Sequence, residues 1–184
     1  MALLPTQRIR ALAQQGMITP FDERGLSNGR TYGLGPASYD LRLKDTTWVW
    51  PGWGRLGRTI ERLNIPDDVG ALVKAKSTNA RVFINASQST FVDPGFAGTL
   101  VVEMTRHLPW PVRIKAGTPI AQLLFLRCEE PTEMPYRGKY QNQPDAITGA
   151  IFEDTLTVTQ QVSLKLSKVL LAAARWLRST GDRT

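Results

Sequence analysis

Hydrophobic residues recur along most of the chain in runs of strand length, separated by turns that contain glycine or proline. In residues 99–104, Leu100, Val102 and Met104 alternate with the other three residues, as in a strand with one buried face. Comparable runs are SYDLRL (38–43), TTWVW (46–50), ALVKA (71–75), RVFIN (81–85), PVRIKA (111–116) and IAQLLFL (120–126). Many short strands with little helix between them predict a mainly β fold, either a barrel or a sandwich.

Two segments have helical spacing instead. Near the N-terminus, Thr6 is expected to cap a short helix that runs to about Gln15 and ends at Gly16. Between Val162 and Leu177, apolar residues share one helical face and basic residues lie away from it. Such a helix packs on its own domain or another subunit, or lies on a membrane surface, and packing is the simplest interpretation. We therefore predict one domain over residues 1–150 and a helical extension over 151–184.

The positive charge of the chain is concentrated near its C-terminal end. Of the net charge of +7, residues 155–184 contribute +4, from five cations and one carboxylate, which leaves +3 for the rest. A body this weakly basic predicts no binding to nucleic acid, although it suffices for one small anion. No apolar run is long enough to span a membrane, the start lacks the core of a signal peptide, and the single Cys128 suits a reducing compartment. These features predict a cytoplasmic protein.

The scarcity of histidine and cysteine restricts the chemistry. With only His107 and Cys128, the chain lacks the ligand sets of structural zinc sites and of zinc deaminases, and Ser-His or Cys-His nucleophile systems are disfavoured. His107 is expected on the surface or in a loop. Residues 52–57 match the glycine spacing of a dinucleotide fingerprint, but Pro51 precedes them and no βαβ unit surrounds them, so a loop is the better interpretation.

Three polar segments remain as candidates for function. Residues 74–81, KAKSTNAR, combine cations with hydroxyl groups, as a polyphosphate site requires, and residues 136–143, YRGKYQNQ, form a polar loop that contains glycine. In residues 91–103, FVDPGFAGTLVVE, a turn at Asp93 leads into a strand that carries Glu103. Taken singly, each segment also has an ordinary interpretation, as a basic turn, a surface loop and an exposed acid.

Together and in order, the segments resemble the dCTP deaminase branch of the dUTPase-like superfamily. RIRALAQQGMITPFDE (8–23) and GLGPASYDLRL (33–43) are similar to the opening of that family, and KSTNAR (76–81) to its phosphate-binding segment. VDPGFAGTLVVE (92–103) is similar to its central motif, AGTPIAQLLF (116–125) to the strand that follows, and YRGKYQNQ to its nucleotide lid. The resemblance covers about residues 9–143, which is most of the chain.

The resemblance implies a distorted β-barrel that assembles as a homotrimer with active sites between subunits. It implies hydrolytic deamination of dCTP to dUTP and ammonia without zinc, with Mg²⁺ accompanying the triphosphate. Glu103 would be the general base for the water that attacks C4 of cytosine, Arg81 would orient it, and Ser77 and the backbone near Thr90 would position the water. The nucleotide-binding residues that it implies for phosphates, sugar and lid are Lys76, Ser77, Thr78, Asp93, Phe96, Gln122, Tyr136, Lys139 and Gln143.

Several residues depart from the family's pattern. Lys76 stands where the family usually has arginine, so it keeps the charge and loses the bidentate fork, which predicts weaker phosphate binding. Asn79 and Phe83 stand where leucine and often glycine are usual, and Arg106 replaces a common asparagine. The tail after Gln143 lacks the usual Ser-Arg ending. These differences concern substrate preference more than fold.

Other functions stay open at this point. One is a bifunctional enzyme that also cleaves the triphosphate to give dUMP and pyrophosphate, and another is a plain dUTPase. The sequence Phe96-Ala97-Gly98 with Glu103 downstream favours the deaminase, whereas Asp93 together with Glu103 would also serve a bifunctional enzyme. A third is a catalytically weak nucleotide-binding trimer whose basic C-terminal helix engages a partner, which the unusual tail supports.

Overall fold

The computed structural model of the chain describes residues 2–88, 91–143 and 145–152. The chain divides into two compact units, residues 1–147 and 148–184. The helix expected between Val162 and Leu177 lies outside the described residues. Within the described part of the chain, no helix is long and apolar enough to cross a membrane.

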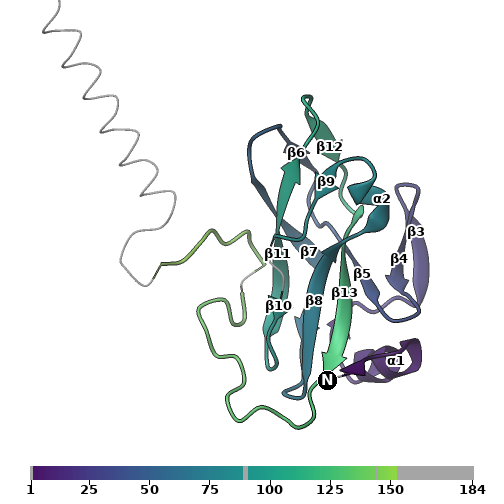
Figure 1. Ribbon diagram of the computed structural model, residues 1–184, viewed down its shortest axis with the longest axis vertical. Coiled ribbons are helices and arrows are strands. Elements are labelled where there is room, and N and C mark those ends of the chain that lie inside the picture. The colour runs from purple at the N-terminus through teal and green to yellow at the C-terminus, as the bar shows by residue number, and fades with distance from the viewer. Residues whose placement is uncertain (1, 89–90, 144, 153–184) are drawn as a thin grey trace, which may run out of the picture. The chain divides into compact units, whose positions relative to one another are not determined.

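Antiparallel strands are the main regular structure of the first unit (Figure 1). The larger sheet has the order β10-β8-β13-β5-β4-β3, and its seventh strand, β1, pairs with β13. Its strands are β1 (Ala2–Leu3), β3 (Arg24–Ser27), β4 (Arg30–Leu34), β5 (Tyr39–Arg42), β8 (Val69–Ala75), β10 (Phe91–Val92) and β13 (Pro119–Arg127).

A second sheet has the order β2-β7-β11-β9, and β6 pairs with β12 by itself. These strands are β2 (Ile18–Thr19), β6 (Thr47–Val49), β7 (Arg55–Asn64), β9 (Ile84–Asn85), β11 (Ala97–Arg106) and β12 (Val112–Ile114). The prediction of a mainly β, distorted fold of this class is confirmed, with the described strands in three hydrogen-bonded sheets and not in one closed ring.

The core follows the alternation of the strands. On β11, Val102 and Met104 are buried while Val101 and Glu103 are only partly covered, as the alternating pattern predicts. On β13, Ala121, Leu123 and Phe125 have no exposed surface. Apolar side chains from both larger sheets join one continuous cluster, which holds the sheets together by removing apolar surface from water.

The N-terminal helix differs from the prediction at its first residue. Helix α1 (Thr6–Gln14) has Pro5 as its N-cap, and the Thr6 hydroxyl caps nothing in the helix. It lies instead against the carbonyls of Gly35 and Pro36, at 2.6 and 2.8 Å, and so ties the helix to the loop after β4. The predicted end is confirmed, because Gly16 has a φ of 95° just beyond the C-cap.

Three parts of the strand pattern differ from the prediction. Strand β7 was not predicted, and it includes residues 55–57, the end of the segment interpreted as a loop. The β3–β4 hairpin, with Asn28-Gly29 in positive-φ conformation at its turn, was also missed. The predicted strand 81–85 was wrong in its first half, since residues 81–83 form a turn and only β9 is extended.

A buried polar network joins the two larger sheets. Glu61 on β7 has no exposed surface and accepts hydrogen bonds from the Arg42 Nε at 2.7 Å and from the Arg42 backbone N–H at 2.8 Å. Arg42 also donates to Asp22 at 2.8 Å and lies over the Tyr32 ring, 4.1 Å from its centroid. Burial raises the pKa of Glu61, and the Arg42 interactions oppose that rise. Strands β5 and β7 are thereby linked through charge as well as through packing.

Candidate active site

Glu103 lies at the border of a small, otherwise apolar cavity. It stands on β11 opposite Leu56 of β7, and it is half-buried. The cavity has a volume of about 30 Å³, and its lining residues come from β8, β10, β11 and the segment after β9: Val73, Ala86, Phe91, Val92, Leu100, Val101, Val102 and Glu103. This is enough space for one water molecule. Glu103 is therefore neither a fully exposed surface acid nor a core residue.

A bulge in β7, the strand that pairs with β11, sets the register that brings Glu103 to this position. The pairing with β7 shifts between Thr99 and Val101, where three residues of β7 oppose Leu100 alone. The buried Thr59 hydroxyl accepts a hydrogen bond from the Leu100 N–H at 3.0 Å and donates to the Glu61 carbonyl at 2.8 Å. The bulge therefore leaves no unsatisfied N–H at Leu100, and the strand resumes regular pairing before Glu103.

The predicted phosphate-binding segment forms a single helical turn, α2 (Ser77–Ala80). Ser77, Thr78 and Arg81 are exposed, so their hydroxyl groups and guanidinium are available to a ligand. Asn79 points the other way and has only 1% of its surface exposed. The turn therefore has an outward polar face and a buried inward face.

Lys76, just before α2, is buried and forms an ion pair with Asp40 of β5. Gln122, also predicted to bind nucleotide, donates to the Ser38 hydroxyl at 3.0 Å beside this pair. Burial raises the pKa of Asp40, and the Lys76 ammonium and the Gln122 amide oppose that rise. The structure thus brings Lys76 and Gln122 together, along with two residues, Ser38 and Asp40, that the sequence reasoning did not assign. Both residues lie in segment 33–43, which resembles the family, and that resemblance was the sequence signal that could have identified them.

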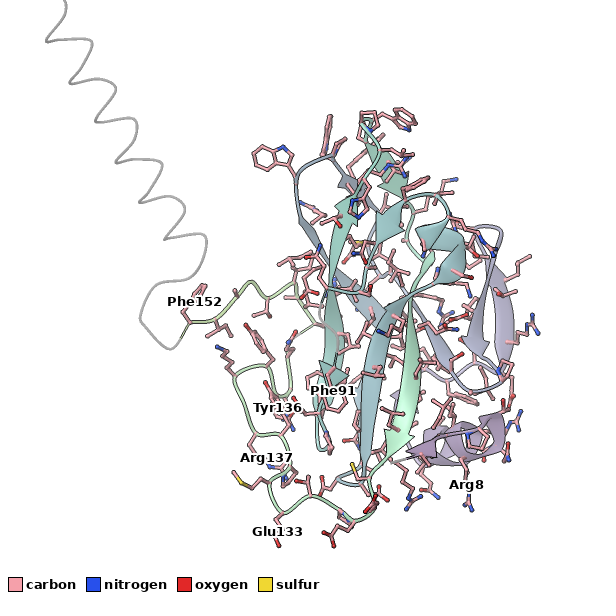
Figure 2. All side chains as sticks on the ribbon, viewed as in Figure 1. Arg8, Phe91, Glu133, Tyr136, Arg137 and Phe152 are labelled. Atoms are coloured by element: carbon pink, nitrogen blue, oxygen red, sulfur yellow. The ribbon has the colours of Figure 1, made fainter. Side chains whose placement is uncertain are left out.

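The turn at Asp93 and the predicted lid lie together. Gly95 has a φ of 82°, and the Phe96 N–H donates to the Asp93 carbonyl at 3.2 Å, which closes the turn and leaves Asp93 exposed. Phe96 is buried against Tyr136, with ring centroids 5.9 Å apart, and the Tyr136 N–H donates to the Pro94 carbonyl at 2.8 Å. Figure 2 shows Tyr136 on the chain segment that follows β13.

The rest of the lid lies along the start of β11. Gln141, which the sequence reasoning missed, accepts from the Ala97 N–H at 3.0 Å and donates to the Gly95 carbonyl at 2.9 Å. Gln143 forms a bridge with Gly98, where a Cβ would come within 3.3 Å of the Gln143 nitrogen, so the close approach requires glycine. Lys139 is exposed and faces the Tyr140 ring at 5.8 Å.

The predicted residues therefore fall into three groups within one chain. Glu103 borders its cavity, α2 presents Ser77, Thr78 and Arg81, and the lid meets the Asp93 turn. Lys76 and Gln122 lie at the base of the α2 group. Thr90 lies outside the described residues.

Comparison with known proteins shows to which family the chain belongs. A domain model described as dCTP deaminase-like matches residues 49–128. The chain is 32% identical over 163 residues to a dCTP deaminase of Campylobacter curvus, covering 71% of this chain and 87% of that protein. It is 31% identical over 176 residues to a dCTP deaminase of Acidobacterium capsulatum, covering 78% and 96%. The chain belongs to the dCTP deaminase family.

A solved structure supports the fold of this family member. The chain resembles the crystal structure of 2'-deoxycytidine 5'-triphosphate deaminase from Agrobacterium tumefaciens, with a TM-score of 0.53 and 20% sequence identity. The similarity covers 67% of this chain and 47% of that one, so the chain spans about half the length of that structure.

Two departures from the pattern of the dCTP deaminase family connect α2 to the strand of Glu103. Arg106, at the end of β11, donates to the Val82 carbonyl at 2.5 Å and to the Trp110 carbonyl at 3.3 Å. The His107 N–H donates to the Phe83 carbonyl at 3.1 Å, and His107 itself is exposed, as expected. Phe83 has a φ of 57°, a conformation that glycine adopts readily and a bulky side chain does not. The turn after Arg81 is therefore fixed to the strand that carries Glu103.

Proposed function

We propose that this chain catalyses the hydrolytic deamination of dCTP to dUTP and ammonia, with Glu103 as general base. The observation that carries the mechanism is the half-buried Glu103 at the edge of a cavity of about 30 Å³, which is otherwise lined by apolar side chains. A water held there would lie beside the carboxylate with little competing solvent. The activity of the Campylobacter and Acidobacterium relatives, named as dCTP deaminases, supports the choice of reaction.

In this mechanism Glu103 takes a proton from water as the oxygen attacks C4 of cytosine. The same carboxyl group then delivers that proton to the departing ammonia, so Glu103 returns to its starting state. A general base must lie within hydrogen-bond reach of the proton that it removes, and a water in the cavity beside Glu103 would meet that condition. Arg81 would balance the negative charge that develops near the reacting base, and Ser77 would position the water.

The nucleotide would be held by the other two groups. The exposed hydroxyls of Ser77 and Thr78 suit the phosphates, and Asp93 on its closed turn suits the hydroxyl of the deoxyribose. Lys76 is engaged with Asp40, so in our proposal it supplies charge at the base of the phosphate site. Tyr136, Lys139 and Gln143 would cover the triphosphate from the lid, and Phe96 would lie near the sugar.

Magnesium is the cofactor that we propose for the triphosphate. Mg²⁺ is usually bound through one or two carboxylates together with substrate phosphates. Asp40 is not assigned to the ion, because it is buried and paired with Lys76, so in our proposal Mg²⁺ comes with the triphosphate. Bound with the nucleotide, the ion would neutralise part of the phosphate charge.

The decisive experiment gives the purified full chain dCTP, dUTP and dCMP separately, each with Mg²⁺, and resolves the products by ion-exchange chromatography. We expect dUTP and ammonia from dCTP and no reaction with dCMP. Formation of dUMP and pyrophosphate would establish the bifunctional alternative, which the presence of both Asp93 and Glu103 supports. Nucleotide binding without turnover would overturn the enzyme proposal and favour a regulatory role.

Two further measurements test the cofactor and the assembly. We propose that the reaction needs no zinc, so a zinc-selective chelator should leave the rate unchanged when Mg²⁺ is kept in excess. We also propose a homotrimer with active sites between subunits, which predicts a sedimentation mass three times that of the 20.5 kDa chain. Full activity in a monomer would contradict the shared site.

A further inference from the structure

A group of exposed tryptophans lies where β6 pairs with β12, at the end of the first unit opposite helix α1 (Figure 1). Four of the five tryptophans of the chain belong to it, each with 51 to 75% of its surface exposed: Trp48, Trp50, Trp53 and Trp110. We call these four residues the tryptophan patch. Large apolar side chains gathered on a surface usually mark a site of interaction with a protein or a membrane.

The strands and loops that carry the patch are joined to one another. Trp48 lies opposite Arg113 in the β6–β12 pair, so the two side chains share one face of this ribbon. Arg106 donates to the Trp110 carbonyl at 3.3 Å and forms a bridge with Pro51, the residue after Trp50. The two tryptophan-bearing loops are therefore held side by side by the backbone and by Arg106, and the fold itself presents the rings to solvent.

Positive charge borders the patch without any negative charge from the same segments. Residues 46–55 and 106–116 contain no aspartate and no glutamate. The exposed cations of these two segments are Arg55, Arg113 and Lys115. The carboxylate of Asp45, which precedes the first segment, is paired with Arg58 at 2.8 Å. The patch is therefore an apolar surface whose charged border is complementary to a negatively charged partner.

A hollow that opens to solvent lies between three of the tryptophans and has a volume of about 500 Å³. Its lining residues are Thr46, Thr47, Trp48, Trp50, Trp53, Gly54 and Arg55. The Arg55 Nε donates to the Thr47 hydroxyl at 2.8 Å, which holds the guanidinium beside the indole rings. Guanidinium groups bind phosphate well, so the hollow combines apolar walls with a group that suits a phosphate ester.

We propose that the tryptophan patch binds the surface of an anionic lipid bilayer. Tryptophan favours the boundary between membrane and water, where its ring is in an apolar environment and its N–H stays near water. The bordering cations would lie at the level of the lipid phosphates, where an anionic surface attracts them. Such a contact lies on the membrane and does not cross it, and no helix of the described residues is long and apolar enough to cross.

The test measures cosedimentation of the full chain with vesicles of phosphatidylcholine mixed with phosphatidylglycerol, and with vesicles of phosphatidylcholine alone. We expect binding to the mixed vesicles and much weaker binding to the neutral ones. Trp53→Ser should lower the partition into mixed vesicles about tenfold, because one large apolar side chain no longer leaves water. Arg113→Ala should lower it about fivefold, through the loss of one cation at the anionic surface.

Two control variants change the same kinds of residue outside the patch. Met134→Ser removes an apolar side chain that is 88% exposed on the segment after β13, and Arg8→Ala removes an exposed cation on α1 (Figure 2). Both should leave the partition into mixed vesicles unchanged. A partition of Trp53→Ser equal to that of the unaltered chain, or an equal loss in Met134→Ser, would overturn the proposal.

A second measurement observes the patch directly and needs no change in it. In Trp176→Phe, every tryptophan that remains in the chain belongs to the patch. Quenching of its fluorescence by lipids with brominated acyl chains therefore reports insertion of the patch and not of the basic C-terminal segment. We expect quenching in the mixed vesicles, and its absence would contradict the proposal.

The other occupants of such a patch are a single-stranded nucleic acid, whose bases could stack on the rings, and a second copy of this chain. The net charge of +3 before residue 155 is weak for nucleic acid. Binding of an oligonucleotide, or self-association, that Trp53→Ser abolishes while the unaltered chain ignores the vesicles would overturn the membrane proposal. The result is independent of whether the chain deaminates dCTP, because no residue of the patch belongs to the proposed active site.

Discussion

Glu61 and Glu103 lie on the paired strands β7 and β11, and their side chains have different surroundings. Each oxygen of Glu61 accepts a hydrogen bond from Arg42, and the residue has no exposed surface. Glu103 is half-buried and borders a cavity with room for water. The contacts of Glu61 join two strands in the core, whereas Glu103 lies where a small cavity meets the strand. The two acids on these paired strands therefore differ both in burial and in what surrounds them.

The surroundings of the two residues extend this contrast. Beside Glu61, Arg42 also donates a hydrogen bond to Asp22 and lies over the Tyr32 ring, so the guanidinium has several partners. By contrast, α2 contains Asn79, whose Oδ1 has no hydrogen-bond partner among the described residues, and the turn after α2 has Phe83 at positive φ. Unsatisfied or strained groups persist only where the rest of the structure compensates for them, and they concentrate at functional sites.

The largest effect is expected from breaking the Arg42–Glu61 pair. Arg42→Met leaves the buried Glu61 charge without its partner, which should lower the free energy of unfolding by about 3–5 kcal/mol. Denaturant titration followed by circular dichroism measures this change. Adding Glu61→Leu to the variant should recover much of the loss, because the unpaired charge is then gone.

The exposed pair of Arg10 and Glu23 provides the control. Its partners have 39% and 57% of their side chains exposed, so Arg10→Met should lower the free energy of unfolding far less than Arg42→Met does. If Arg42→Met were no more harmful than Arg10→Met, the buried network would not be what joins β5 to β7.

The next effect concerns rate and not stability. Glu103→Gln should lower the turnover of dCTP by about 10²-fold or more, because the amide cannot accept the proton of the attacking water. Its free energy of unfolding should stay within about 1 kcal/mol of the original, since Glu103 lies at a cavity edge. Glu133→Gln, on the segment after β13 (Figure 2), should alter neither quantity. Unchanged turnover in Glu103→Gln would remove this residue from the mechanism.

The sequence predicted the regular strands well and the long-range polar contacts poorly. Strands β11 and β13 contain apolar runs of strand length, and both were predicted from these runs. Strand β7 was missed because Glu61 and Thr59 occupy core-facing positions that the pattern reserves for apolar residues. Only Arg42, distant in the sequence, makes Glu61 acceptable there.

The candidate site shows the same division. The matched motifs name Glu103, Ser77 and the lid as candidates, since a motif records which residue types stand in order. They did not show that Lys76 is engaged with Asp40, because that pairing depends on how β5 lies beside β13. They also favoured Gln143 over Gln141, although Gln141 makes two hydrogen bonds to the start of β11.

A smaller effect is expected from pH. Burial raises the pKa of Glu61 above its unfolded value of about 4.3, so the folded chain binds this proton more tightly than the unfolded chain does. The resulting stability is fully present below about pH 4.3 and is lost as the pH rises through the folded pKa. A tenfold difference in proton affinity corresponds to about 1.4 kcal/mol.

The stability advantage of the unaltered chain over Glu61→Gln should therefore shrink between pH 4 and the folded pKa. Denaturant titrations at several pH values measure it, with Glu133→Gln as a control that shows no such trend. An advantage that grew with pH over this window would mean that the Arg42 interactions outweigh burial.

The smallest effect should come from Phe83, in the turn between α2 and β9. At a φ of 57° an L-residue bears a cost of about 1–2 kcal/mol, which glycine avoids, and the exposed ring has little packing to lose. Glycine also makes the unfolded chain more flexible by up to about 1 kcal/mol, so Phe83→Gly should raise the free energy of unfolding by about 1 kcal/mol or less. Phe83→Ala removes the same ring and keeps the backbone cost, so the difference between the two variants isolates the strain. Equal stabilities for glycine and alanine would show that the turn between Arg81 and β11 is relaxed, and the contrast with the Glu61 network would then rest on Asn79 and Glu103 alone.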